Sequence, residues 1–439
     1  MPHLFVMSVD SLFTEELADV RNLPGFGQIL PRAAIFEHVD CVYPTLTFVC
    51  HASIMTGCWP DKHGVHHNQV LDPATEDSAW HWDAASIKVP TILDYAKAAG
   101  LSTAAVSWPV TVGASAADVN VPEMWVSNEE AWNGPGLLAK ALDELYEKNC
   151  TPYGHELYLR HRDVIRYTDD PQPDEFDVRC VEDILREKKP DVFLTHQASL
   201  DHARHFHGVK SPEAREALRR HDAWIARCIE AMKDAGTYDD TIFVILGDHG
   251  HVPIEARVAP NILLRDAGLI NVDENGRVAD WRAYVLAGGA SGQLFVRDKS
   301  DLPAAMAALQ PLVDDGLISD VLTREEVGER FHEGGDFELM LEGAPGYGVV
   351  GSVTGKVVTP SSDPDYYYAV STHGHLPFRG PKPPFIVAGP GVVPGRYVGA
   401  RLVDQAPTLM NLAGIPFDAA DLDGENLFAE GSRAVRLPD

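Results

Sequence analysis

The sequence predicts an α/β fold with a mostly parallel central sheet that is covered by helices on both faces. Short apolar segments rich in β-branched residues alternate with amphipathic segments along the chain, and residues 213–235 show the clearest helical spacing of apolar side chains. Alternation of this kind favours parallel strands joined by helices. The expected strands are residues 4–9, 102–106, 191–195, 241–246 and 384–388. Functional sites in such sheets form at the carboxyl ends of the strands.

Residues 255–365 interrupt this alternation. They contain the glycine-rich run Gly288-Gly289-Ala290-Ser291-Gly292, two strand-like segments at 293–296 and 337–341, and many turn residues. A chain of 439 residues also exceeds the size at which a single core stops growing. We therefore expect a main α/β core formed by residues 1–254 and 366–439, with residues 255–365 as an inserted, cap-like α+β subdomain.

The charge balance limits the class of partner. The chain has 36 Lys and Arg against 65 Asp and Glu, a formal charge of −29. Broad nucleic-acid or anionic-membrane surfaces need clustered basic residues, so neither partner is expected. An anionic substrate would need a local source of positive charge, which bound metal cations supply.

The first residues and the cysteines indicate where in the cell the protein is expected to be. Met1-Pro2-His3 leads straight into an apolar segment with no basic region before it, and no apolar stretch is long enough to span a membrane. The six cysteines lack a C-x-x-C pair. We interpret them as reduced thiols and expect a cytoplasmic protein.

Asp and His residues follow several of the expected strands in four clusters. Carboxylate and imidazole together form a ligand set suited to Zn²⁺ or another first-row divalent ion. In the second cluster Asp201 and His205 are four residues apart and would share one helix face, but spacing alone leaves His205 or His207 open, as it does His373 or His375. The clusters are Asp10; His196, Asp201, His202, His205 and His207; Asp248, His249 and His251; and His373 and His375.

Thr47 is the candidate nucleophile. It stands where a helix can begin, and Gly57 stands where that helix can end. A hydroxyl at a helix N-terminus is exposed beside N–H groups that favour an oxyanion, here those of Thr47 or Phe48. Threonine needs a base or a metal to become a nucleophile. The alternative interpretation is that Thr47 is only a helix N-cap.

These residues, in this order, resemble the type I phosphodiesterase/nucleotide pyrophosphatase family of the alkaline phosphatase superfamily. The resemblance covers most of the chain but is weak through residues 255–365. Further matching segments are Phe48 after the threonine, Thr56-Gly57, Trp59-Pro60, His63-Gly64, Asn68 and Ser107-Trp108-Pro109. Val49-Cys50 replaces the usual Pro-Asn of the family, and Val110 replaces a glycine.

The resemblance implies an alkaline phosphatase-like fold, two bound metal ions and a phosphothreonine intermediate on Thr47. The ions would be Zn²⁺, with Mn²⁺ as the alternative. Asn68 would hold a non-bridging phosphate oxygen, and Phe48 would stack on a base or aryl group, although a core aromatic is the alternative for Phe48. The implied ligands are Asp201, His205 and His373 for one ion, and Asp10, Thr47, Asp248 and His249 for the other.

The resemblance leaves several activities to compare. Neither Cys41 nor Cys50 lies in a sulfatase-type sequence. Only Lys62 is a basic residue near Thr47, which favours diesters or pyrophosphates over monoesters, since a monoester dianion needs more positive charge. A phosphonoacetate hydrolase is the alternative, although no lysine pair for the substrate carboxylate is evident. A non-catalytic metal-binding protein is the remaining hypothesis. We expect a small phosphorylated metabolite or nucleotide-like substrate, and the oligomeric state stays open.

Overall fold

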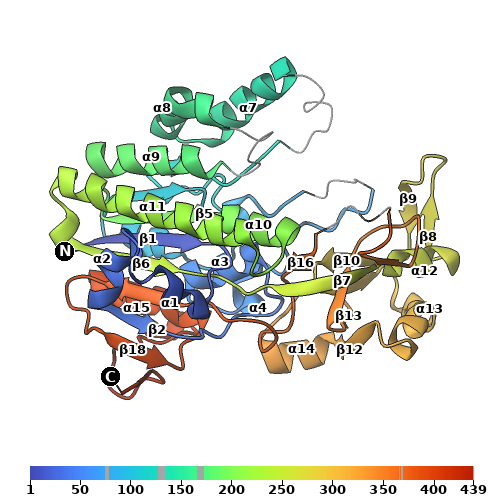
Figure 1. The fold of residues 1–439 in the computed structure, drawn as a ribbon. Helices are drawn as coiled ribbons and strands as arrows, with labels where there is room; N and C mark the ends of the chain where they lie inside the picture. Colours follow the sequence, from blue (N-terminus) through green and yellow to red (C-terminus); the bar gives the residue numbers. More distant parts are fainter. Residues whose placement is uncertain (75–78, 127–134, 166–172, 365, 367–368, 439) are drawn as a thin grey trace.

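A long mixed sheet runs through the centre of the molecule (Figure 1). The computed structural model describes residues 1–438 except 75–78, 127–134, 166–172, 365 and 367–368. Within these residues the sheet contains β1 His3–Val9, β2 Ala33–Phe36, β3 Thr103–Val106, β4 Val119–Val121, β5 Val192–Gln197, β6 Thr241–Leu246, β17 Phe385–Ala388, β18 Gly395–Val398 and β19 Val435–Arg436. Their spatial order is β19-β18-β2-β17-β6-β1-β5-β3-β4. All five strands expected from the sequence are present in it.

Parallel pairing aligns the carboxyl ends of the central strands. β1 lies between β5 and β6 and is parallel to both, with Val9 opposite Gln197 and Ser8 opposite Leu246. β3 and β4 continue this parallel half. β17 is one of the strands outside the parallel part of the sheet, because it is antiparallel to both β6 and β2. Phe385 pairs with Leu246, so the chain enters β17 at the carboxyl edge of β6 and needs no crossover helix.

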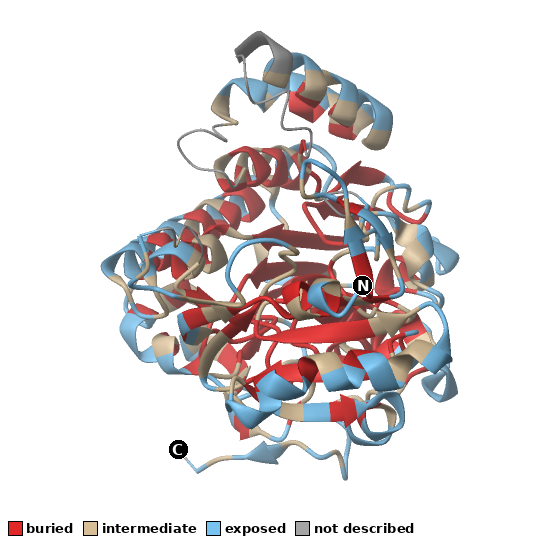
Figure 2. Ribbon diagram, turned by 90° about the vertical axis from the view of Figure 1, so that its right-hand side faces the viewer, coloured by how far each residue is buried: buried red, intermediate tan, exposed pale blue. Residues whose placement is uncertain are grey.

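Helices cover both faces of the sheet, as predicted. Alternate residues of β1 belong to two different hydrophobic clusters, Phe5 and Met7 to one and Leu4 and Val6 to the other. Figure 1 shows the long helices α9 and α11 along one side of the sheet and α15 on the opposite side, and Figure 2 shows the buried central strands. The first cluster contains residues of α1 Leu17–Val20, α2 Phe26–Ile29, α7 Pro135–Asn149, α8 Pro152–His161, α9 Asp174–Glu187, α10 Ser199–His207 and α11 Pro212–Ala235. The second contains residues of α3 Thr47–Thr56, α5 Ile92–Ala98 and α15 Gln405–Ala413, and the short α4 Pro60–His63 follows α3.

The segment between β6 and β17 builds separate sheets that lie to one side of the central one (Figure 1). It has a hydrophobic cluster of its own, which includes Val258, Val285, Leu294 and Leu341. Its elements are β7 Val252–Val258, α12 Pro260–Asp266, β8 Ile270–Val272, β9 Val278–Trp281, β10 Ala283–Gly288, β11 Ser291–Val296, α13 Leu302–Asp314, β12 Ile318–Thr323, α14 Arg324–Phe331, β13 Leu339–Gly343, β14 Gly346–Val349, β15 Val358–Pro360 and β16 Ser371–Thr372. The boundaries of the expected subdomain stay a prediction.

Among the described residues, no helix is both long enough and apolar enough to cross a bilayer.

Candidate active site

Four separate segments bring carboxylates and imidazoles together at the carboxyl edge of the sheet. Parallel pairing explains part of this convergence, because β1 and β6 end side by side. The α10 helix and the end of β16 supply the rest. The side chains are Asp10 after β1, Asp201 and His205 on α10, Asp248 and His249 after β6, and His373 after β16.

Two glycines fix the backbone beside these ligands. Gly374 has a φ of +85°, and a Cβ at this position would overlap the carbonyl oxygen of Gly288. A Cβ at Gly250 would overlap the carbonyl oxygen of Pro381. Glycine is therefore required after His373 and after Asp248-His249, where the chain turns closely against neighbouring backbone.

The first ligand group surrounds Asp201. Its Oδ2 lies 3.2 Å from His205 Nε2, and its Oδ1 lies 3.9 Å from His373 Nε2. The opposite ring nitrogens are already used, because His205 Nδ1 donates to the Ser371 carbonyl at 2.9 Å and His373 Nδ1 donates to the Thr45 carbonyl at 3.1 Å. Each ring therefore turns its Nε2 toward the carboxylate, and the neutral form of each ring could bind a metal ion through that atom.

His251 joins this group, although it was not among the ligands expected from the sequence. Ser371 donates its hydroxyl proton to the Arg204 carbonyl, so His251 Nδ1 donates to Ser371 Oγ at 3.1 Å. The Nε2 lone pair of His251 then faces Asp201 Oδ1 at 2.5 Å. Both side chains belong to one group of ligand atoms that could hold the same metal ion.

The second ligand group surrounds His249. Its Nε2 lies 3.1 Å from Thr47 Oγ1, 3.2 Å from Asp248 Oδ2 and 3.4 Å from Asp10 Oδ1. Asp248 is oriented by the backbone N–H of Ser11, which donates to its Oδ1 at 3.0 Å. The candidate nucleophile thus contacts His249, which in turn lies beside Asp10 and Asp248.

The electrostatics of this cluster indicate missing positive charge. Burial, reinforced by Asp248 and Asp201, raises the pKa of Asp10 well above its usual value. Burial likewise lowers the pKa of His249 and of His373, so both rings are neutral. Asp10 Oδ1 and Asp248 Oδ2 are buried and accept no hydrogen bond from any described residue.

The residues present therefore fit divalent metal ions. The ligand atoms of Asp201, His205, His251 and His373 lie within 4.8 Å of one another, and those of Asp10, Asp201 and His249 form a second such group. Mixed oxygen and nitrogen donors, unpartnered carboxylate oxygens and correctly oriented imidazoles all match the needs of Zn²⁺ or a similar ion.

The geometry also shows which histidine of each pair faces the site, a choice that sequence spacing left open. His205 faces Asp201, whereas His207 is exposed at the end of α10. His373 faces Asp201, whereas His375 is turned away, with its Nδ1 bonded to the Leu376 carbonyl. These placements agree with the ligand set that the family resemblance implied.

Thr47 begins α3, as expected, but it is not the N-cap. Leu46 occupies the cap position, and Thr47 is the first helical residue with its hydroxyl directed at His249. The helix ends at Gly57, which has a φ of +70°. The backbone N–H of Phe48 donates to Asn68 Oδ1. The backbone N–H of Thr47 has no acceptor among the described residues and remains available to a phosphoryl oxygen.

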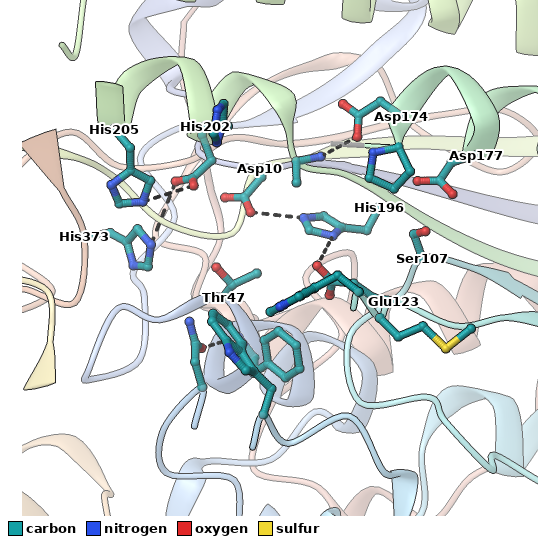
Figure 3. A pocket seen from close by; sticks show the side chains of 18 residues that line it. Asp10, Thr47, Ser107, Glu123, Asp174, Asp177, His196, His202, His205 and His373 are labelled. Carbon is teal, nitrogen blue, oxygen red and sulfur yellow. Dashed lines mark hydrogen bonds and ion pairs between the residues drawn. The ribbon is translucent and has the colours of Figure 1, made fainter. Parts of the chain in front are cut away.

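A cavity of about 360 Å³ opens beside Thr47 (Figure 3). Phe48 lines it while being only 1% exposed, so it is a core aromatic that also reaches the cavity wall. Several other residues that line the cavity were not expected from the sequence, because they come from distant segments and share no motif. These residues are Trp80, Glu123, Trp125, Asp174 and Asp177.

Comparison with known families agrees with the site. The family model for type I phosphodiesterase / nucleotide pyrophosphatase matches residues 4–376. The chain belongs to this family. Every expected metal ligand, Thr47 and Asn68 lie within the matched range.

Individual relatives of the family are distant. Human ectonucleotide pyrophosphatase/phosphodiesterase family member 1 is 22% identical over 255 residues, which are 57% of this chain and 23% of that protein. An uncharacterized pyrophosphatase/phosphodiesterase of Schizosaccharomyces pombe is 24% identical over 215 residues, 48% of this chain and 37% of that protein. The chain thus spans well under half the length of these two curated relatives.

Solved structures of the family share the fold. Murine ectonucleotide pyrophosphatase/phosphodiesterase 5 superposes with a TM-score of 0.65 at 16% identity, covering 97% of this chain and 98% of that one. The human counterpart gives the same TM-score and identity, with 97% of each chain covered. The large mixed sheet with helices on both faces is therefore the fold of this family.

Proposed function

We propose that the protein is a metal-dependent phosphodiesterase or nucleotide pyrophosphatase that acts through a phosphothreonine intermediate on Thr47. The observation that carries this proposal is the position of Thr47 Oγ1, 3.1 Å from His249 Nε2 at the edge of the cavity. Family membership supports hydrolysis of a phosphoryl compound. The murine relative offers further support, because a structure of it contains an inactive threonine-to-alanine variant in complex with AMP.

The expected metal ligands divide into two sets. Divalent ions bound there would supply positive charge for the phosphoryl oxygens and would lower the pKa of the Thr47 hydroxyl. Asp201, His205 and His373 would hold one ion, with His251 as an additional donor, and Asp10, Thr47, Asp248 and His249 would hold the other.

The protein residues then perform a two-step displacement. Thr47 Oγ1 bonds to phosphorus as the bond from phosphorus to the first ester oxygen breaks, and the hydroxyl proton ends on the departing alcohol. Water then replaces Thr47 at phosphorus and restores its hydroxyl. The backbone N–H of Thr47 and the side-chain amide of Asn68 donate hydrogen bonds to the phosphoryl oxygen that gains charge, each worth on the order of 3 kcal/mol.

The lining of the cavity favours a diester over a monoester. No Lys or Arg is among the described residues that line it. Lys62, the basic residue noted near Thr47 in the sequence, pairs instead with Asp423 at 3.2 Å. A monoester dianion or a phosphonate with a carboxylate would lack a side-chain cation there, so the monoesterase and phosphonoacetate hydrolase alternatives are less well supported.

The test compares two chromogenic substrates with the Zn²⁺-loaded protein. We expect kcat/KM for bis-p-nitrophenyl phosphate to exceed that for p-nitrophenyl phosphate. A preference for the monoester would contradict the diesterase assignment. Absence of turnover on both would favour the non-catalytic alternative, and release of inorganic phosphate from phosphonoacetate would favour the phosphonate alternative.

A further inference from the structure

Arg204 is a buried arginine that lies close to the metal ligands without being one of them. It stands on α10 between Asp201 and His205, is 0% exposed, and is not among the described residues that line the cavity. Its guanidinium carbon lies 3.8 Å from the centroid of the Phe13 ring. An arginine is almost never fully buried unless it is paired, because removing the charge from water is costly. The partners of this side chain therefore indicate what it does.

The guanidinium of Arg204 joins separate segments of the chain. Nη2 donates to both carboxylate oxygens of Glu16, at 2.8 and 2.7 Å, and this carboxylate is itself only 14% exposed. Nη1 donates to the Val209 carbonyl, which follows α10. Nε donates to the side-chain oxygen of Ser11 at 3.0 Å. Glu16 balances the charge, and the bond to Ser11 is the one that reaches the active site.

Ser11 lies next to one expected metal ligand and holds another. It directly follows Asp10, and its backbone N–H donates to Asp248 Oδ1 at 3.0 Å. Its φ is +58°, in the left-handed region where residues other than glycine are uncommon. A strained conformation of this kind persists only where the surrounding structure determines it. The bond from Arg204 is one such constraint, because it ties the Ser11 side chain to α10.

The main chain of Arg204 takes part in the first ligand group. Ser371 Oγ donates to the Arg204 carbonyl oxygen at 2.6 Å. The Ser371 carbonyl oxygen in turn accepts a hydrogen bond from His205 Nδ1 at 2.9 Å. The main chain of Arg204 thus supports the first ligand group from behind, while its side chain reaches the segment that carries Asp10 in the second ligand group.

We propose that Arg204 is a positioning residue that fixes the second ligand group relative to the first through its bond to Ser11. This inference goes beyond the proposed function and rests on its assignment of two metal ions. Without the bond, the strained Ser11 segment can relax, and Asp10 and Asp248 are no longer held in place for their ion. The alternative is that Arg204 and Glu16 form an ion pair that only stabilises the fold. A buried ion pair is weak evidence for that role, because the cost of desolvation offsets the attraction.

The test removes the link between Arg204 and Ser11 from each side. Ser11→Ala deletes the acceptor and keeps the backbone N–H that bonds to Asp248. Arg204→Met deletes the donor, and it is combined with Glu16→Gln because a mostly buried carboxylate without its cation would destabilise the fold. A third variant carries all three substitutions, so that the effects of the two changes can be compared in a cycle.

A matched control removes a different ion pair. Arg227 Nη2 on α11 lies 2.6 Å from Glu182 Oε2 on α9, and neither residue belongs to either ligand group. Arg227→Met with Glu182→Gln therefore removes the same kinds of side chain as the arginine variant does. It should leave the binding of both metal ions unchanged.

The measurement is Zn²⁺ binding rather than activity. Competition with a chromophoric chelator gives the affinity for each ion, and circular dichroism shows whether each variant is folded. We expect the wild type to bind two ions tightly. Arg204→Met/Glu16→Gln should keep one ion and bind the other roughly 10- to 100-fold more weakly, as the loss of a side chain that orients metal ligands does. Ser11→Ala should weaken the same ion, and the triple variant should lose no more than the arginine variant, because both changes break one bond.

The outcomes separate this inference from the proposed function. Unchanged affinity in Arg204→Met/Glu16→Gln would overturn the inference and leave the two-ion assignment intact. Equal weakening of both ions, the same loss in the Arg227 control, or losses that multiply in the triple variant would also overturn it. If the arginine variant does not fold, unchanged affinity in Ser11→Ala overturns the inference by itself. A wild-type protein that binds fewer than two ions would overturn the metal assignment of the proposed function and the inference with it.

Discussion

The side-chain oxygen of Asn68 accepts a hydrogen bond from the backbone N–H of Phe48 at 2.9 Å. This bond links the Asn68 loop to the first turn of α3, where Thr47 begins the helix. It also fixes which end of the Asn68 amide is free, because the oxygen is occupied and the NH₂ group remains to donate. Asn68 is 7% exposed and lines the cavity beside Thr47, so that donor is positioned next to the expected phosphoryl group.

Asn68→Ala should lower kcat/KM by roughly 10²–10³ with unchanged metal content, because one oxyanion donor is lost. Asn68→Asp is a sharper variant, since its carboxylate can still accept the Phe48 N–H but cannot donate to the substrate. Steady-state kinetics on a diester and elemental analysis check both variants. Near-normal turnover of Asn68→Asp would show that Asn68 acts through Phe48 rather than on the substrate.

The fold was predictable because its strands are local apolar segments. The strand expected at residues 241–246 is β6, and the helix expected over 213–235 is α11. The direction of β17 was not predictable in this way. It depends on the chain arriving at the carboxyl edge of β6, which is a property of the whole connection rather than of its own residues.

The site was predictable where its residues are adjacent in sequence. Asp248 and His249 follow one strand, and Asp201 and His205 share one helix face. His251 was missed because its value as a ligand depends on a ring orientation set by Ser371, 120 residues away. The presence of Glu123 and Asp177 in the cavity lining depends on tertiary packing, because they come from separate segments of the chain. The cytoplasmic location remains a prediction.

His251→Asn should weaken metal binding, because this ring presents a lone pair to Asp201 Oδ1. We expect metal affinity to fall by roughly 10- to 100-fold when a side chain that supports a metal site is removed. Competition with a chromophoric chelator measures it, and X-ray absorption spectroscopy counts the imidazoles bound to Zn²⁺. The exposed His207→Asn is the matched control. Unchanged affinity in His251→Asn would leave His251 as a structural residue only.

The wild-type protein should carry two divalent ions per chain, as the two ligand groups imply. Their removal should lower Tm, since binding to the folded state stabilises it and Asp10, Asp201 and Asp248 lose their counter-charges. Elemental analysis after chelator-free purification and thermal unfolding with and without EDTA check this expectation. A metal content below about one ion per chain would contradict the two-ion site.

Glu342 should make stability depend on pH. It accepts hydrogen bonds from Tyr43 Oη at 2.9 Å, the Leu376 N–H at 2.9 Å and Arg379 Nη1 at 3.0 Å. Burial nevertheless raises its pKa from 4.5 to about 7. The folded state then binds more protons than the unfolded state between these values, so this group's contribution to the free energy of unfolding falls as pH rises from about 4.5 to 7.

Glu342→Gln removes this proton uptake, so Tm should fall less between pH 5 and pH 8 in the variant than in the wild-type protein. Thermal unfolding at constant ionic strength measures the two slopes. Glu329→Gln, an exposed glutamate on the nearby helix α14, is the control and should keep the wild-type slope. Identical slopes for Glu342→Gln and the wild type would show that Glu342 is ionised across this range.

Thr47→Ala tests the chemistry on which the proposed function depends. The variant should lose ~10⁴ or more in kcat, because only charge and donor stabilisation remain without the nucleophile. It should still bind metal, since the Asp and His ligands are unchanged. Ser53→Ala is the control hydroxyl on the same helix, because Ser53 Oγ bonds to His63 Nε2 at 2.9 Å, away from the cavity, and its loss should cost far less activity. Mass spectrometry of acid-quenched turnover should find the phosphoryl group on the peptide that contains Thr47 in the wild type and in Ser53→Ala. If Thr47→Ala retains a tenth of wild-type activity, the phosphothreonine route is wrong, and direct attack by water is the better account.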